Sequence, residues 1–453
     1  MSYYILPKIN TELILDPCLH LSMDKITTFI SQSIVSYLVK TTDSLHHLLQ
    51  LDSTYTFKIL EEIIHPYEYL FSHLPSSNLS ICKAKPTFKM YYDMIEIYNT
   101  LKLSECLPSK NMTALYYGYH GSCVIDYMQY TRENFNDRNI LIEPIQDKRI
   151  GIITPLNNGH TNALNELTYT PIPNDIANAC DYIYYELPDK TYADTNQYIL
   201  GLLKAVKYML MYQSSRGCMI LKLGNTYYKP VIDILYLISS LYNKVYIIKP
   251  NTNNNIYDEK YIVCKTFTAS LQKKNQYLDK IDKIYTICFR EQHEINIQSI
   301  MKNEISAYFL NKMEECNIIM GQQQIDAYDQ MINLVKNKHK VEKIEALRKH
   351  NIQKCIHWCE KYKMPCNRFA DKINIFLPIS AYDNNLVKDT DENDIIYAEA
   401  EEAEEAEEAE EAEEDCGKNA RVYISNNRID DEEEASQDYH INTDLLHEID
   451  FGD

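Results

Sequence analysis

The stretch that decides the fold begins Gly217-Cys-Met-Ile-Leu-Lys-Leu223 and continues, after an apolar segment with helical spacing, as Val245-Tyr-Ile-Ile-Lys-Pro250. It ends with a third apolar run, Lys260-Tyr-Ile-Val-Cys-Lys-Thr-Phe267. Short runs rich in β-branched and aromatic residues are typical of buried strands, so the block predicts strand, helix, strand, loop and strand. The connection Asn251–Tyr257 is too short for a crossover helix, and the last two strands are therefore expected to pair antiparallel.

The same alternation of strands and helices extends back to Phe88. The predicted strands are Thr113–Tyr117, Asn139–Glu143, Tyr182–Tyr185, Cys218–Leu223, Val245–Lys249 and Lys260–Phe267. The predicted helices between them are Ser122–Tyr130, Thr195–Tyr212 and Pro230–Tyr242. Such alternation is typical of an α/β domain, here residues 86–267, with a mostly parallel sheet and an antiparallel last strand.

The regions on either side of this domain are expected to be helical. Residues 1–85 form the N-terminal helical region, because the apolar side chains of Asp24–Leu48 recur with a period close to 3.6 residues. Residues 268–382 form the C-terminal helical region, which contains the basic stretch Lys336–Arg368 with 10 basic and 3 acidic residues. Residues 383–453 are predicted to be an acidic, disordered, low-complexity tail, because the repeated Glu-Glu-Ala triplets of Ala398–Glu414 repel one another and offer no stable apolar face.

The charge of the chain is concentrated in that tail. Residues 391–453 carry 25 acidic and 3 basic residues, a net charge of −22, whereas the other residues carry 42 basic and 40 acidic groups. The body of the protein is therefore close to neutral, and its charge does not argue against an RNA partner.

Cysteine use and hydropathy predict a protein of a reducing, cytoplasmic compartment. The 13 cysteines are scattered through a long chain without the spacing of a disulfide framework. We recognise no signal peptide and no apolar stretch long enough to span a bilayer, so no membrane partner is expected. The abundance of Ile, Asn, Lys and Tyr is typical of an AT-rich genome, such as that of a large DNA virus, whose protein would act in the host cytoplasm or the virion.

Two residues of the deciding stretch carry chemistry. Lys222 ends one strand and Glu259 opens the last one. With Lys89 and Glu186 they resemble the Lys-Asp-Lys-Glu set of the FtsJ-like RNA ribose 2′-O-methyltransferases, in which the aspartate position is occupied here by Glu186. The resemblance implies a class I methyltransferase fold and S-adenosyl-L-methionine as cofactor. It also implies that Lys222 is the base, Lys89 its cationic neighbour, and Glu186 and Glu259 the carboxylates that orient it.

The resemblance also places the cofactor-binding residues. The family turn Pro-Gly-Gly corresponds to His120-Gly121-Ser122, and Gly118 precedes it. Gly118 and Gly121 are the implied contacts for the cofactor, and Glu143 is the acidic residue implied for its ribose. Each position also has a plainer interpretation: the lysines as solvated side chains, Glu186 as a surface residue before Pro188, and the glycines as turn residues.

Two functions therefore stay open. The first is an RNA 2′-O-methyltransferase, with the cap-proximal ribose of mRNA as one candidate target. The second is a catalytically inactive methyltransferase-fold subunit that binds RNA or acts as a scaffold, with protein partners on the helical flanks. A virion or scaffold protein is a third, weaker alternative.

The C-terminal helical region offers two further hypotheses. The basic stretch Lys336–Arg368 is suited to RNA phosphates, with Trp358 and Tyr362 as candidates for stacking on bases, or it is a solvated helix face. The acidic tail is a candidate to bind this stretch and compete with RNA. Cys355, His357, Cys359 and Cys366 fit no standard zinc spacing, so no metal site is predicted.

Overall fold

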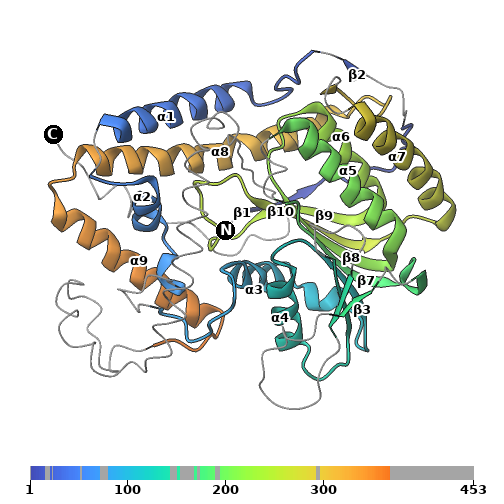
Figure 1. Ribbon diagram of the computed structural model, residues 1–453, viewed down its shortest axis with the longest axis horizontal. Helices are drawn as coiled ribbons and strands as arrows, with labels where there is room; N and C mark the ends of the chain where they lie inside the picture. Colours follow the sequence, from blue (N-terminus) through green and yellow to red (C-terminus); the bar gives the residue numbers. More distant parts are fainter. Residues whose placement is uncertain are drawn as a thin grey trace.

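The computed structural model describes residues 2–15, 21–22, 24–51, 54–71, 80–142, 150–153, 168–170, 174–188, 194–291 and 296–367. These residues form a mixed α/β structure around a nine-stranded sheet in the order β1-β9-β10-β8-β7-β3-β4-β5-β6 (Figure 1). The strands are β1 (Ser2–Leu6), β3 (Thr113–Tyr117), β4 (Arg138–Ile142), β5 (Ile150–Ile153), β6 (Thr168–Thr170), β7 (Cys180–Tyr185), β8 (Gln213–Leu223), β9 (Tyr242–Lys249) and β10 (Lys260–Phe267). The acidic tail lies outside the described residues.

The centre of the sheet is parallel. Strands β4, β3, β7 and β8 pair parallel with one another, and β10 pairs antiparallel with both β8 and β9. The antiparallel hairpin predicted from the short connection between β9 and β10 is therefore confirmed. Strands β1 and β5 also pair antiparallel with their neighbours, β9 and β4, so the sheet contains more reversed strands than the single one predicted.

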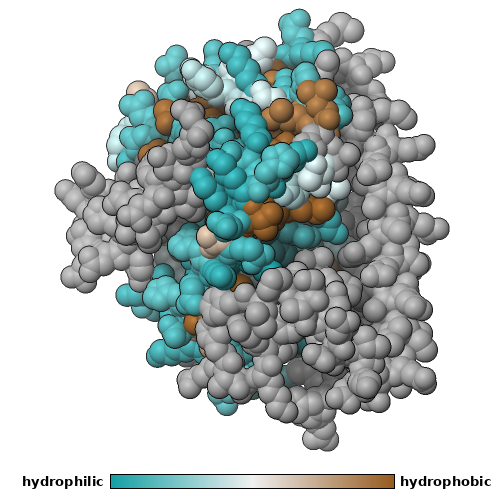
Figure 2. Space-filling view, turned by 90° about the vertical axis from the view of Figure 1, so that its left-hand side faces the viewer, coloured by the Kyte–Doolittle hydropathy of each residue, from teal (hydrophilic) through white to brown (hydrophobic). Residues whose placement is uncertain are grey.

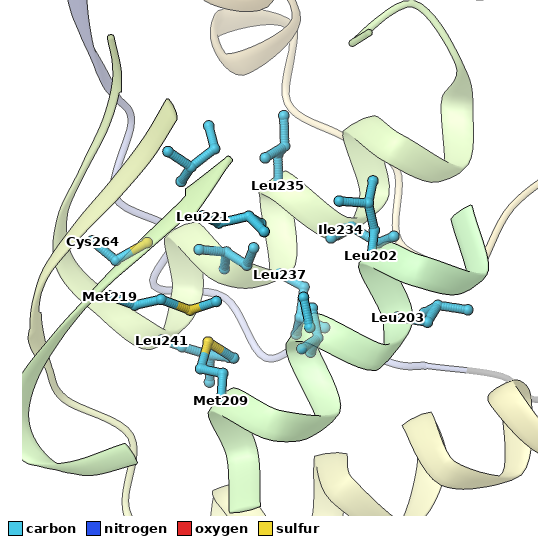
Figure 3. Packing of buried hydrophobic residues seen from close by; sticks show 14 of the residues in the cluster. Leu202, Leu203, Met209, Met219, Leu221, Ile234, Leu235, Leu237, Leu241 and Cys264 are labelled. Carbon is cyan, nitrogen blue, oxygen red and sulfur yellow. The ribbon is translucent and has the colours of Figure 1, made fainter. Parts of the chain in front are cut away.

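Helices cover both faces of the sheet, as Figure 1 shows. The helices on one face are α5 (Thr195–Tyr212), α6 (Lys229–Leu241) and α7 (Leu271–Glu291), and those on the other are α3 (Met90–Thr100) and α4 (Gly121–Thr131). Each face of the sheet has its own apolar core. Because side chains alternate along a strand, Met219 and Leu221 of β8 enter the core beneath α5, α6 and α7, whereas Cys218 and Ile220 enter the core beneath α3 and α4. Figure 3 shows how residues of α5 and α6 such as Met209 and Leu237 pack around Met219 and Leu221.

The remaining helices form a layer beside the sheet. They are α1 (Gln32–Leu51), α2 (Phe57–Ile64), α8 (Ala307–Lys336) and α9 (Val341–Lys361), and α1 lies along α8 (Figure 1). A third apolar core joins α1, α2 and α8 through Leu38, Leu60 and Met331. Figure 2 shows the side of the molecule on the left of Figure 1, and most of its described side chains are hydrophilic.

The N-terminal region contains more than the predicted helices. Strand β1 joins the sheet at β9, and a short strand β2 (Leu21–Ser22) pairs with β11 (Asn296–Ile297). The helix predicted from Asp24 begins only at Gln32, because Phe29 and Ile30 are held outside it by hydrogen bonds from their N–H groups to the Tyr227 carbonyl. The segment before Gln32 therefore pairs with the loop after β8, where Thr28 lies opposite Tyr228, and does not extend the helix.

No helix in the described part of the chain is both long enough and apolar enough to cross a bilayer.

Candidate functional site

Strand β3 is the point from which the sheet extends in both directions. Its two neighbours, β4 and β7, are both parallel to it. In open α/β sheets, ligands bind outside the carboxyl ends of the strands at such a switch point. The carboxyl ends of β3 and β7 meet there. Glu186, directly after β7, donates its N–H to the carbonyl of Tyr117, the last residue of β3, at 2.8 Å.

Lys222 lies at the same edge between two carboxylates. Its Nζ is 3.0 Å from Glu186 Oε1 and 3.0 Å from Glu259 Oε1. The pairing of the strands explains this arrangement, because Leu221 lies opposite Tyr185 and Lys222 opposite Tyr261. Residues that follow β7 and precede β10 are thereby brought to the end of β8. Three of the four residues proposed from the resemblance are thus in one cluster.

The electrostatic interactions in this cluster favour the charged forms of Lys222 and Glu186. Burial alone would lower the pKa of Lys222, but Glu259 and Glu186 outweigh burial and raise that pKa above its ordinary value. Burial would raise the pKa of Glu186, but Lys222 and His120 lower it to about 2. Lys222 is therefore an ammonium and Glu186 a carboxylate at neutral pH. The Lys222 side chain is 4% exposed and Glu259 is 38% exposed, so solvent reaches the cluster from the Glu259 side.

His120 completes the coordination of Glu186. Its backbone N–H donates to Glu186 Oε2 at 3.1 Å, and its ring Nδ1 lies 2.8 Å from Glu186 Oε1. Tyr184 adds a longer hydrogen bond to Oε2 at 3.5 Å. Sequence analysis noted His120 only as a replacement for the family proline. The signal that was missed is a polar side chain in the turn after β3, facing an acidic residue after β7.

Backbone conformation and packing require a glycine at position 118, and position 121 is closely packed. Gly118 has φ of +133°, and a Cβ there would lie 2.6 Å from the Cβ of Glu186. A Cβ on Gly121 would lie 2.6 Å from Leu141 Cδ1. Close approach of backbone to side chain explains both residues, so they are not independent evidence for a cofactor. Glu143, the third proposed cofactor residue, lies outside the described residues.

Lys89 is near the cluster in the fold but forms an ion pair elsewhere. Its Nζ lies 2.6 Å from Glu68 Oε1, and its side chain is 45% exposed. The residues on either side of it do reach the site: the Phe88 ring is 4.5 Å from that of His120, and Met90 Sδ accepts a hydrogen bond from Tyr184. Lys89 itself is thus paired with Glu68, whereas its two chain neighbours contact the site.

The loop that carries Glu259 is fixed by a second buried lysine. Lys249 Nζ donates to Asn253 Oδ1, the Tyr257 carbonyl and the Glu259 carbonyl at 2.9, 2.7 and 2.8 Å. Burial lowers the pKa of Lys249 to about 8. Sequence analysis did not select Lys249, although its place directly before Pro250 and the Asn-rich loop was a usable signal.

The helical flanks hold the same loop from outside. Asn254 Nδ2 and Tyr257 Oη both donate to the Glu61 carboxylate, at 2.9 Å each. Ile256 is buried in the core of α1, α2 and α8, and its carbonyl accepts a hydrogen bond from Gln324 of α8. The flanking helices therefore contribute to the position of Glu259.

The structure supports only part of the RNA-binding role considered for the basic stretch Lys336–Arg368. Trp358 is buried and donates its indole N–H to Glu96 at 2.5 Å, so the prediction that it stacks on bases is wrong. Tyr362 packs against it, with ring centroids 4.8 Å apart. Lys349 and Lys363 of this stretch are exposed to solvent.

Comparison with models of known protein families gave no match, and a search of curated protein sequences found no significant similarity. The functional interpretation therefore depends on the chemistry of the Lys222 cluster.

Proposed function

We propose that this protein is an S-adenosyl-L-methionine-dependent RNA ribose 2′-O-methyltransferase of the FtsJ-like, class I type. The observation that carries the proposal is the position of Lys222 between Glu186 and Glu259 at the carboxyl edge of the sheet, beside the switch point. A sheet with a parallel centre and an antiparallel strand β10 is what the class I fold implies. A buried amine held by two acidic groups is suited to controlling the proton of a hydroxyl nucleophile.

The residues of the cluster fit such a reaction. Bound S-adenosylmethionine would supply the methyl group, and the backbone of Gly118–Gly121 is the proposed contact for it. Glu186 and Glu259 are the carboxylates proposed to orient Lys222. Lys222 orients the ribose hydroxyl and takes up its proton. One further buried acceptor at this edge, Asn225 Oδ1, has no hydrogen-bond partner among the described residues and suits a hydroxyl donor.

Lys222 must lose its proton before it can act as a base. With both carboxylates in place its pKa is raised, so the resting side chain holds the proton. Of the two carboxylates, Glu259 is the one that solvent and substrate reach, since it is 38% exposed and Glu186 only 2%. Movement of Glu259 towards the substrate would remove the larger of the two carboxylate contributions and lower the pKa of Lys222 from its raised value.

RNA is the proposed substrate, with the cap-proximal ribose of mRNA as the target tested first. The exposed lysines of the basic stretch are proposed phosphate contacts, and the acidic tail is proposed to compete for them. Deletion of residues 391–453 should then strengthen RNA binding at low salt and have less effect at high salt. Equal affinity of the full and shortened chains at low salt would contradict the competition.

Methyl transfer can be measured directly. The protein is incubated with tritium-labelled S-adenosylmethionine and capped RNA, either unmodified or already 2′-O-methylated at the cap-proximal ribose. We expect label only in the unmodified RNA. We also expect a loss of at least about 100-fold for Lys222→Met, because general base catalysis contributes effects of this size. Arg138→Met, at the opposite edge of the sheet, is the matched control and should keep full activity.

The inactive alternative is favoured by one observation. Both oxygens of Glu186 are already engaged by His120, Lys222 and Tyr184, and Lys89 pairs with Glu68. Calorimetry with S-adenosylmethionine separates the two functions. Cofactor binding with methyl transfer supports the enzyme, whereas RNA binding without cofactor binding would replace it with the inactive subunit.

A further inference from the structure

Two cysteines from distant parts of the chain lie directly opposite each other. Cys82 and Cys366 form an isolated antiparallel bridge. The hydrogen bonds beside it run from Lys83 N to the Pro365 carbonyl, at 2.8 Å, and from Asn367 N to the Ile81 carbonyl, at 2.9 Å. Cys82 and Cys366 are therefore a non-hydrogen-bonded pair, the type in which Cα atoms are about 4.5 Å apart and side chains are closest. That separation falls within the range that a disulfide requires.

A third thiol interacts with this pair. Cys359, in the last part of α9, is hydrogen-bonded to Cys82 and lowers the pKa of the Cys82 thiol to about 7, although burial opposes the change. The pKa of Cys359 itself is raised, mainly by the same hydrogen bond, so Cys359 keeps its proton and donates it. A large fraction of Cys82 is therefore thiolate at neutral pH, which is the nucleophilic form.

The three thiols differ in access to solvent. Cys82 and Cys359 are completely buried, whereas Cys366 is partly exposed. A small oxidant therefore meets Cys366 first. Among the described residues, no group of three or more His, Cys, Asp or Glu side chains is arranged to hold a metal ion.

We propose that Cys82 and Cys366 are a redox site that closes into a disulfide on exposure to hydrogen peroxide, with Cys359 as the residue that activates Cys82. In the first step the Cys366 sulfur attacks one peroxide oxygen, which gives a sulfenic acid, and the other oxygen leaves as water. In the second step the Cys82 sulfur attacks the Cys366 sulfur, the S–S bond forms, and the hydroxyl leaves as a second water. Both thiol protons and both peroxide protons are accounted for in the two waters.

Closure would connect two structural layers covalently. Residue 82 leads into the segment that carries Lys89 and α3, and residue 366 follows α9. The disulfide would fix the end of α9 to the helical face of the sheet domain. This inference does not depend on the proposed methyltransferase activity, because it concerns only the three thiols.

The test uses the full-length reduced protein. The protein is treated with a small excess of hydrogen peroxide, its remaining thiols are alkylated without unfolding and then after unfolding, and its peptides are identified by mass spectrometry. We expect a linked peptide pair that contains Cys82 and Cys366 and lacks two hydrogen atoms. Cys366→Ser should abolish the link, whereas Cys106→Ser, a change at another partly exposed cysteine, should leave it unaffected.

Cys359→Ala, which removes the hydrogen-bond donor, tests the activating role separately. The rate of disulfide formation at neutral pH should fall by about threefold to tenfold, because Cys82 loses the thiol that stabilises its thiolate. A rate that is unchanged would remove Cys359 from the proposal. Oxidation of Cys366 to sulfinic acid without any link, or a link between Cys82 and Cys359 instead, would overturn the Cys82–Cys366 site.

Discussion

The substitution Lys222→Met tests whether a single ammonium organises the candidate site. It removes the cation that neutralises Glu186, a carboxylate that is only 2% exposed, and leaves a side chain of similar length. The Glu186 pKa is lowered from 4.5 to about 2 in the folded protein. That difference corresponds to about 3 kcal/mol of stabilisation, which agrees with the cost of breaking a buried ion pair.

The loss of stability caused by Lys222→Met should become smaller as the pH falls. In the wild type the folded-state pKa of Glu186 lies below the unfolded value, so its contribution to stability is fully present above about pH 4.5 and is lost as the pH falls towards 2. In the variant, the contribution of Lys222 is lost, and burial raises this pKa relative to the wild type while only His120 still opposes it. The unpaired carboxylate then destabilises the fold at pH 7 and is relieved when it binds a proton. The loss of about 3 kcal/mol should therefore shrink between about pH 7 and pH 4.

Urea denaturation of both proteins at the two pH values measures this difference. Arg138→Met, which removes an exposed ion pair with Asp175, is the matched control and should cost far less stability than Lys222→Met at either pH. The double variant Lys222→Met/Glu186→Gln should recover much of the lost stability, because the buried charge is gone. A loss below about 1 kcal/mol for Lys222→Met, or an equal loss at both pH values, would refute the reasoning.

Three further substitutions test separate features. Gly118→Ala should lower the free energy of unfolding by about 2–4 kcal/mol in urea denaturation, because its φ is +133° and the new Cβ meets Glu186; a neutral result would contradict the close approach. Lys249→Met should increase hydrogen exchange of amides 251–259 by at least about tenfold, because the loop loses the donor to three acceptors; unchanged protection would show that the flanking helices suffice. Lys89→Met should cost less than about 1 kcal/mol, since its ion pair is exposed, and a loss comparable to that of Lys222→Met would place Lys89 in the buried cluster.

Much of the central fold follows from local sequence. The predicted strands Thr113–Tyr117 and Lys260–Phe267 and the helix Thr195–Tyr212 have the observed bounds, because each is a dense apolar segment whose ends carry turn or capping residues. The Asp194 side chain, for instance, accepts hydrogen bonds from the first N–H groups of α5. Strand β1 was not predicted, since nothing within five residues indicates a partner more than two hundred positions away.

The candidate site was predictable where strand order alone determines proximity. Lys222, Glu186 and Glu259 come together because the ends of neighbouring strands meet at one edge. The interaction of His120 with Glu186 depends on the path of the turn after β3, which no local pattern records. The pairing of Lys89 with Glu68 likewise depends on how the segment before α3 packs against the N-terminal region.

The pairing of β1 with β9 has a consequence for synthesis on the ribosome. Ser2 lies opposite Lys249, so β1 has no partner until the chain has been translated as far as β9. Until then its backbone groups are open to other chains or to chaperones. Once β1 docks, it covers the outer edge of β9 and so protects the hairpin that carries Glu259. Strand β1 therefore waits for a distant partner before it can join the nascent sheet, and production of the protein should be unusually sensitive to changes in Ser2–Leu6.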